Sequence, residues 1–555
     1  MTHRALITPP AVPSLLMDDV RYAAVGGLLA GSAAGTAFAV ACVLAGCSSS
    51  DETTGSGPST DSSGHSQVVV AMNATSEPAA GFDPLVSWGC GEHVHEPLIQ
   101  STLVTTDEQL NIVSDLATEY LCSDDGLVWT FTIRDDVLFT DGEPLTARDV
   151  AFTVNGVIQS SASEADLSMV DTAVAVSDTV VELHLNKPYN ALLYTLAVLG
   201  IVPEHAYGEG YGAQPIGSGR YVLERWDKGQ QVVFASNPDY YGTTPTMERV
   251  VVVFMDEDAA LAAVQKGEVD IAYTYATHAH QSFDGYELVA YETVDSRGVS
   301  LPTVPSGQTK VLEGDIAYEM GNDVTCDLAI RRAINCGIDR ESMIEQVLDG
   351  YGKVAYSVGD GMPWSSDDMQ VDFDREQANR LLEEAGWLRG EDGVRSRDGV
   401  RAAFDIWYSS DDSVRQALAN EFANQMSELG LEVTPRGGSW DEIYPRQFSQ
   451  PILWGWGSNS PVEVYELHYS TGWGNYSCYE NETVDAYLDQ ALAQTDVEAS
   501  YEFWKRRCGT ELRAWHPRAP RRGHGSPTST TCISSARGWM SPIKSRTPMG
   551  TAGRW

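Results

Sequence analysis

Between residues 68 and 504 the chain alternates strand-like and helix-like segments, and this alternation restricts its fold more than any other feature. β-Branched and aromatic residues predict strands over 68–70, 128–133, 180–185, 250–254, 403–408 and 431–434. Apolar residues at three- and four-residue spacing predict helices over 258–266, 327–347, 375–385, 414–429 and 483–493. Because neither type of element forms a block of its own, we expect an α/β fold with mixed sheets.

Capping and turn residues stand at several predicted element borders. Asp256 and Asp258 can cap the helix over 258–266, and Gly267 can end it. Asp141-Gly142 is typical of a turn, and Thr146 after it can cap a further helix. These residues describe a scaffold and say little about function.

Composition and charge exclude several classes of function. The 555 residues are 43% hydrophobic, which excludes a wholly disordered chain, and 78 acidic against 36 basic residues give a formal net charge of −42. Such a surface repels phosphate backbones and anionic lipids, so we expect no nucleic-acid partner. The motifs GxSxG, GxxxxGK[ST] and HExxH and the EF-hand spacing are all absent from the sequence. We therefore expect no enzyme activity, no catalytic residues and no cofactor.

The first 67 residues predict an export signal and a tether. An uncharged run over 23–46 ends in Leu44-Ala45-Gly46-Cys47, which resembles the bacterial lipobox, so residues 1–47 are interpreted as a lipoprotein signal peptide with Cys47 as the acylated residue. The alternative is a plain transmembrane helix, and translation can start at Met1 or Met17. Residues 48–67, rich in Ser, Thr, Gly and Asp, predict a flexible tether on the outer face of the membrane.

The cysteines suggest free thiols. No CxxC pair occurs among the nine cysteines. Cys326 and Cys336 are expected on one helix, about 15 Å apart at 1.5 Å per residue, which is too far to form a disulfide. Buried free thiols are the expected state.

A series of spaced motifs resembles one known family. In chain order the motifs are Asp83-Pro84, HEPL (95–98), DGLVWTFTIR (125–134), FTDGEPLTARDV (139–150), PIGSGRY (215–221), NPDYYG (237–242), LAIRRAI (328–334) and ANRLLEEAGW (378–387). The series resembles the extracellular solute-binding proteins of family 5, the peptide and nickel class of ABC importers. The resemblance implies a two-lobed periplasmic-binding-protein-like fold of type II, in the large cluster with an extra subdomain in lobe I. It places lobe I at 68–276, lobe II at 277–478 and a return to lobe I at 479–504.

The same resemblance implies capture of a small solute between the lobes and its delivery to permease and ATPase subunits. Peptide-binding relatives use an Asp in a "W..D…DP" stretch to pair with the peptide ammonium group. Here the stretch is LWGWGSNSP (453–461), where Ser458 or Asn459 stands in place of that Asp, and Glu463 can substitute. An ammonium group buried without a partner is costly, which counts against simple peptides with a free N-terminus.

Further candidate ligand contacts leave the solute open. Trp88, Trp454 and Trp456 offer flat ligand walls or belong to the core, and Arg220 can meet a carboxylate or form a surface ion pair. His93 and His95, on one face of an extended segment, can hold a metal or lie at a solvated rim. An oligopeptide and a nickel or metallophore chelate both remain possible. A cell-surface hydrolase and a receptor ectodomain are the rivals from other classes.

Residues 505–555 form an atypical basic tail. Eleven Lys and Arg stand against one acidic residue, Glu511. We interpret this composition as the product of a shifted reading frame, since an adjacent frame can encode an alternating apolar sequence that ends in a His-rich PHGHG run. The alternative is a natural disordered tail. DNA sequence near codon 505 distinguishes the two.

Overall fold

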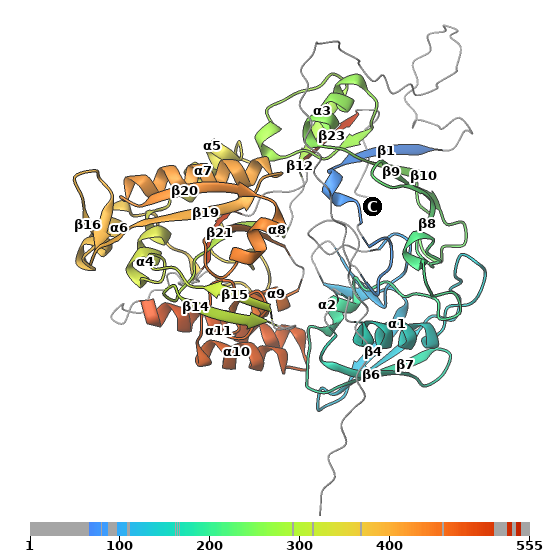
Figure 1. The fold of residues 1–555 in the computed structure, drawn as a ribbon. Helices are drawn as coiled ribbons and strands as arrows, with labels where there is room; N and C mark the ends of the chain where they lie inside the picture. The colour runs from blue at the N-terminus through green and yellow to red at the C-terminus, as the bar shows by residue number, and fades with distance from the viewer. Residues whose placement is uncertain are drawn as a thin grey trace, which may run out of the picture. The chain divides into compact units, whose positions relative to one another are not determined.

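The chain folds around three larger β-sheets flanked by helices (Figure 1). This computed structural model describes residues 66–544 apart from 79, 87–96, 108–110, 161–162, 164, 166, 291–293, 313–315, 367–368, 458–459, 516–529 and 535–539. The predicted signal peptide and nearly all of the predicted tether lie outside the described residues. Among the helices that are described, none is both long and apolar enough to span a bilayer.

The first sheet has seven strands and gathers segments from both ends of the described chain. In spatial order they are β12 (Tyr286–Ala290), β23 (Met540–Lys544), β11 (Ile271–Ala272), β1 (Gln67–Met72), β10 (Arg249–Phe254), β9 (Gln231–Ser236) and β8 (Tyr221–Asp227). β1 runs parallel to β10 and β11, and the other pairs are antiparallel. Helix α3 (Glu257–Lys266) packs on β1 and β11. The expected mixture of parallel and antiparallel strands is therefore present.

The second sheet is an antiparallel unit within the first half of the chain. Its order is β4 (Ala117–Cys122), β5 (Val128–Ile133), β7 (Val180–Leu185) and β6 (Val170–Ala175), and helix α1 (Ala147–Gln159) covers β6 and β7. Thr146 caps α1 in a capping box with Asp149, as the sequence predicts. A small hairpin of β2 (Val104–Thr106) and β3 (Ile112–Ser114) and the short helix α2 (Leu192–Leu196) adjoin this unit.

The third sheet has five strands with helices packed against one face. Its order is β20 (Glu432–Gly438), β19 (Ala403–Ser409), β21 (Ile452–Trp456), β13 (Ser296–Ser300) and β22 (Thr530–Ser534). Helices α4 (Leu328–Gly337), α5 (Arg340–Val347), α6 (Arg375–Glu384) and α7 (Ser413–Glu428) share one buried cluster with Phe404, Ile406 and Leu453 of this sheet.

The remaining strands and α-helices of the described residues are five short strands and four helices in the second half of the chain. The short strands are β14 (Gln308–Leu312), β15 (Ile316–Met320), β16 (Leu388–Arg389), β17 (Arg395–Arg397) and β18 (Val400–Arg401). The helices are α8 (Trp440–Ile443), α9 (Val462–His468), α10 (Glu482–Leu492) and α11 (Val497–Trp515). The last two pack on each other, and Asn190 donates its side-chain amide to the carbonyl oxygen of Ala491 at 2.9 Å.

One predicted helix is wrong in extent. The segment 327–347 forms two helices, α4 and α5, because Ile338 is extended and Asp339 caps α5 by accepting a hydrogen bond from the Ser342 amide at 2.9 Å. Cys326 precedes the cap of α4, so it does not share a helix with Cys336. Both thiols are free, as are those of Cys122 and Cys478.

Two glycines are needed for different physical reasons, and the sequence predicts the role of the first. Gly267 ends α3 in the left-handed region at φ +71°, which an L-residue adopts at a cost. Gly219 instead allows close approach, since an added Cβ would lie 2.5 Å from the Leu98 carbonyl oxygen, and its amide donates to the Ile99 carbonyl oxygen at 2.7 Å. Asp256 occupies the N-cap position of α3 without a side-chain capping bond.

The tail contributes strands to two of the sheets. β22 pairs with β13, and β23 lies between β11 and β12. Helix α11 runs across residue 504 into the segment predicted to be read in another frame. The origin of the tail stays a prediction, as do the lobe boundaries after residues 276 and 478.

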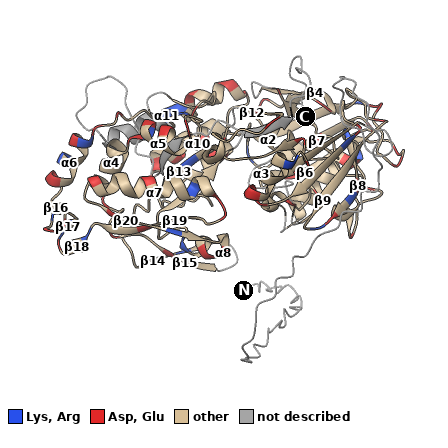
Figure 2. Ribbon diagram, turned by 90° about the horizontal axis from the view of Figure 1, so that it is seen from above, with Lys and Arg blue, Asp and Glu red and all other residues tan. Residues whose placement is uncertain are grey.

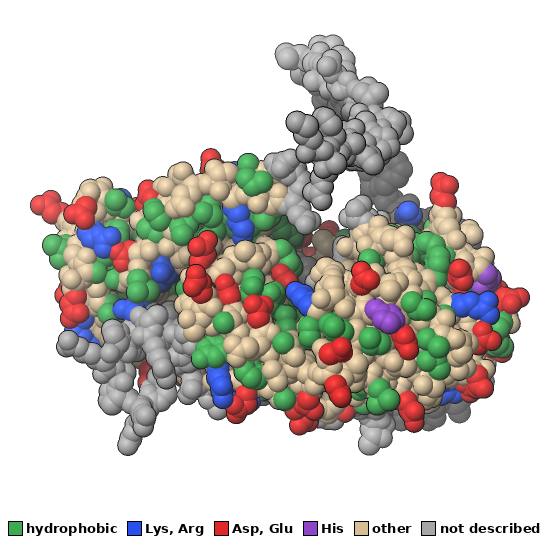
Figure 3. Space-filling model, turned by 90° about the horizontal axis from the view of Figure 1, so that it is seen from below, with side chains coloured by type: hydrophobic (Ala, Val, Ile, Leu, Met, Phe, Trp, Pro, Cys, Tyr) green, Lys and Arg blue, Asp and Glu red, His purple; other side chains and the backbone are tan. Residues whose placement is uncertain are grey.

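Charged side chains are spread over the described part of the molecule. Acidic residues occur on helices and loops around each of the larger sheets (Figure 2). The face drawn in Figure 3 intersperses them with hydrophobic and basic side chains and shows no single basic patch.

Candidate ligand-binding face

The five-stranded sheet carries different side chains on its two faces. Along β21, Trp454 and Trp456 point away from Leu453, because successive residues of a strand face opposite sides. Leu453 belongs to the helix-covered core, whereas the two tryptophans belong to a separate buried cluster. The face opposite α4–α7 is therefore rich in aromatic rings.

These rings stack into an ordered layer centred on Trp454. Its ring stacks on Tyr476, at 4.2 Å between centroids and 14° between planes, and on Trp440, at 5.8 Å and 15°. Its indole Nε1 donates to the Ser300 hydroxyl at 2.9 Å. Tyr444 contacts Trp440 and Trp454, and Trp473 meets Tyr476 edge-on. We call these five residues the aromatic face.

Exposure divides the aromatic face into a core and a rim. Trp454 is 5% exposed and Trp456 is 7% exposed, so both belong to the core rather than to an open ligand wall. Tyr444 and Trp473, at 47% and 64%, are the exposed rings of the group. Of the two roles left open by the sequence for Trp454 and Trp456, the structure supports the core.

Basic side chains border the aromatic face. Arg415 lies over the Trp440 ring at 5.3 Å from its centroid, and Lys310 lies over Phe448 at 4.2 Å. The ammonium of Lys310 donates to the Asn475 carbonyl oxygen at 3.4 Å, and burial lowers its pKa. Burial likewise raises the pKa of Tyr476, so its phenol stays neutral at physiological pH. Polar groups thus border a largely apolar surface.

Glu463 brings a carboxylate to the end of β21. Its Oε1 accepts a hydrogen bond from the Gly457 amide at 3.1 Å, and it stands in the first turn of α9. Gly457 directly precedes Ser458 and Asn459, which lie outside the described residues. The carboxylate that the sequence suggested as a substitute therefore lies beside the segment that matches "W..D…DP".

The structure describes only part of the remaining predicted site. Cys47, Trp88, His93 and His95 lie outside the described residues. Arg220 directly precedes β8 in the seven-stranded sheet, with its guanidinium 5.8 Å from the Tyr240 ring centroid. It therefore belongs to a different sheet from Trp454. Within the described ranges no group of three or more His, Cys, Asp or Glu side chains is arranged to hold a metal.

Several residues of this face were not singled out from the sequence. Trp440 and Tyr444 are four residues apart and contact each other, a spacing that signals neighbours on a helix. Tyr476 has no comparable local signal, because its partner Trp454 is 22 positions earlier in the chain.

Comparison with known proteins identifies the family to which this fold belongs. Residues 111–477 match the model for the middle region of the bacterial extracellular solute-binding proteins, family 5. Protein XP55 of Streptomyces lividans is 33% identical over 77% of this chain and 78% of its own length. The oligopeptide-binding protein AppA of Bacillus subtilis is 27% identical over 72% of this chain and 76% of its own length.

The chain belongs to family 5 of the bacterial extracellular solute-binding proteins. NikZ from Campylobacter jejuni, solved in complex with Ni(L-His), superposes with a TM-score of 0.70 at 23% identity, covering 86% of this chain and 94% of that one. The predicted two-lobed α/β fold with mixed sheets is confirmed. As a member of this family, the protein is the substrate-binding subunit of an ABC importer, with permease and ATPase subunits as its partners.

Proposed function

We propose that this protein captures short peptides through Glu463 and the aromatic face. The observation that carries the proposal is the 3.1 Å hydrogen bond between the Glu463 carboxylate and the Gly457 amide. It fixes a negative charge beside the segment where peptide-binding relatives carry an Asp. An ionised carboxylate there supplies the partner that a peptide ammonium group needs when it leaves water.

The rim of the aromatic face supplies the second part of the site. Tyr444 and Trp473 are exposed, and Trp440 is partly buried between Tyr444 and Trp454. Flat rings bury apolar side chains without a demand for one particular shape, because packing on their faces is not directional. In this site the carboxylate recognises the charged N-terminus of the peptide, and the rings accept side chains of different shapes. Such a combination suits a transport protein that binds peptides of varied sequence.

Binding of a peptide pool tests the proposal. Calorimetric titration with tri- to hexapeptides should show saturable binding, and Glu463→Gln should weaken it about tenfold or more, as expected for a charged hydrogen bond. N-acetylation of the same peptides should weaken binding to the wild type and change little in Glu463→Gln. Glu482→Gln, an exposed change in α10, is the matched control.

A nickel chelate is the alternative cargo, and calorimetric titration also distinguishes it from a peptide. The His93 and His95 pair is the feature that favours it. Titration with nickel and free histidine should give no saturable binding if peptides are the cargo. Binding that His93→Gln and His95→Gln abolish, together with no response to peptides, would contradict the proposal.

The protein is further proposed to release its cargo unaltered and to be held at the membrane by a lipid on Cys47. Mass spectrometry of peptides incubated with the protein should recover them intact. Labelled palmitate should enter the wild type in cells and fail to enter Cys47→Ala. Cleaved peptides would contradict the first statement, and labelling of Cys47→Ala the second.

A further inference from the structure

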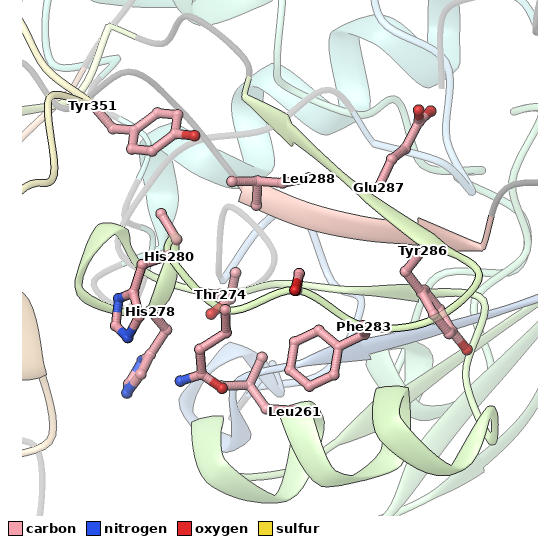
Figure 4. Close-up of a pocket in the computed structure, with 12 residues that line it drawn as sticks. Leu261, Thr274, His278, His280, Phe283, Tyr286, Glu287, Leu288 and Tyr351 are labelled. Carbon is pink, nitrogen blue, oxygen red and sulfur yellow. The ribbon is translucent and has the colours of Figure 1, made fainter.

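A pocket of about 280 Å³ lies between α3 and the segment that leads from β11 to β12 (Figure 4). It is separate from the aromatic face and belongs to no step of the proposed peptide capture. Its lining includes Leu261, Thr274, His278, His280, Phe283 and Leu288. This volume is slightly below the usual range of about 300–1,000 Å³ for small-molecule sites, so the pocket suits a compact ligand.

Thr274 gives the pocket an unsatisfied polar group. The residue is 3% exposed, and its Oγ1 is buried with no hydrogen-bond partner among the described residues. A buried hydroxyl without a partner is unfavourable, because it has lost its bonds to water. A ligand atom that accepts a hydrogen bond from Thr274 would remove this cost.

The two histidines add ring nitrogens to the same pocket. Nδ1 of His278 lies 2.5 Å from Oε1 of Glu257, which leaves Nε2 of His278 as the nitrogen for a ligand. His280, two residues further along, lines the same side of the pocket in Figure 4. The carboxylate of Glu287 points away from the other labelled side chains in that view, so it does not set the charge of the interior.

The opposite part of the lining is apolar. Phe283 and Leu288 come from the segment before β12 and from β12 itself, and Leu261 comes from α3. We propose that this pocket is a second ligand site, which binds a small organic carboxylate with an apolar body. The carboxylate accepts hydrogen bonds from the Thr274 hydroxyl and from a ring N–H of His280, and the hydrocarbon part packs on Phe283 and Leu288.

The pocket is connected to the five-stranded sheet through hydrogen bonds. Oε2 of Glu257 accepts from the Ser413 hydroxyl at 3.2 Å, and that hydroxyl lies 3.1 Å from Oγ1 of Thr277. Ser413 is the first residue of α7. A ligand beside His278 therefore lies at one end of a chain of polar contacts that joins α3 to α7. Because the ligand binds the folded protein, it should raise the thermal stability of the protein.

Titration with phenylacetate tests the site. Calorimetry should show one saturable site per chain, which the uncharged methyl ester fills more weakly. Thr274→Val should weaken phenylacetate binding about tenfold, because it removes a hydrogen bond to a charged group. His280→Gln should also weaken it. Thr309→Val, an exposed change on β14, should bind as the wild type does.

The outcome is independent of peptide capture. Glu463→Gln should leave phenylacetate binding unchanged, so failure of one proposal is distinguishable from failure of the other. Thermal melts of each variant check folding, and His280→Gln, a change to a polar lining residue, provides a second test if Thr274→Val does not fold. Absence of saturable binding in the wild type, or equal affinity in the folded variants and the wild type, would overturn the proposal.

Discussion

The indole of Trp454 lies flat on the ring of Tyr476, with 4.2 Å between centroids and 14° between planes. The two residues come from different parts of the chain, β21 and the loop before α10. Trp440 also stacks on the indole, at 5.8 Å between centroids, and Ser300 accepts its only N–H hydrogen. Contacts with Tyr476, Trp440 and Ser300 therefore hold the buried indole of Trp454 in place.

Replacement of Trp454 should therefore lower the stability of the protein. Trp454→Ala removes a large buried ring and should lower the free energy of unfolding by about 3–5 kcal/mol, measured by urea denaturation with circular dichroism. Trp473→Ala, at an exposed position of the same face, should change it by no more than about 0.5 kcal/mol. Equal stability of the two variants would show that the indole of Trp454 is not part of the core.

Arg395 is a second buried residue with a structural role. It is 1% exposed and donates to the carbonyl oxygens of Leu429 and Trp387, both at 2.7 Å, and to Oδ1 of Asn379 at 2.6 Å. Its guanidinium therefore ties β17 to the ends of α6 and α7. Each of these bonds satisfies an oxygen that has lost contact with water.

Arg395→Met should remove the charged donor from these three oxygens, of which Asn379 Oδ1 keeps a bond from Arg389 at 3.4 Å. The expected loss is about 3 kcal/mol in the free energy of unfolding, because buried acceptors that lose a charged donor are costly. Arg380→Met, on the exposed side of α6, is the control and should be nearly neutral. A loss of the same size in both variants would mean that the buried contacts of Arg395 add nothing.

The sequence predicted the elements well where local signals decide them. The Thr146 cap, the Gly267 end of α3 and the alternation of β19 all follow from neighbours in the chain. The prediction failed over 327–347, since apolar periodicity continues through Asp339 although its side chain caps a new helix. Contacts between distant segments, such as Trp454 with Tyr476, depend on how the segments pack and leave no periodic signal.

The contact between Asp141 and His205 predicts a pH dependence. His205 Nε2 lies 2.8 Å from the Asp141 carboxylate, and this hydrogen bond raises the pKa of His205 above 6.5. Burial alone would raise the pKa of Asp141, but the bonds from His205 and the Glu143 amide outweigh it and lower that pKa below 3.8. The His205 contribution is complete below pH 6.5 and disappears as pH rises through its raised pKa, whereas the Asp141 contribution disappears as pH falls through its lowered pKa.

The pair should therefore stabilise most near pH 5. His205→Gln should reduce the free energy of unfolding there by about 0.5 kcal/mol, since both groups are partly exposed to solvent, and the difference from wild type should shrink by pH 8.5. A double-mutant cycle with Asp141→Asn isolates the interaction. A difference from wild type that grows with pH would contradict the assigned sign.

The two strands of the tail pair with different sheets. β23 forms the only connection in the described sheet between β12 and β11, and β22 covers the free edge of β13. Backbone groups of an uncovered edge face water or another chain, which favours aggregation. The tail therefore supports the region from which β12 and the pocket beside it arise.

A chain that ends at Trp515 should lose that support. Its thermal midpoint should fall by several degrees, as expected for a loss of about 2 kcal/mol or more in a protein of this size, and limited proteolysis should cut first near β12. Replacing residues 505–555 by the product of the adjacent reading frame should raise the midpoint above that of the present chain, because alternating apolar residues suit strand positions better than a basic tail. Equal midpoints for the three proteins would show that the tail strands carry no stability, and a fall in the replaced chain would contradict the predicted change of frame.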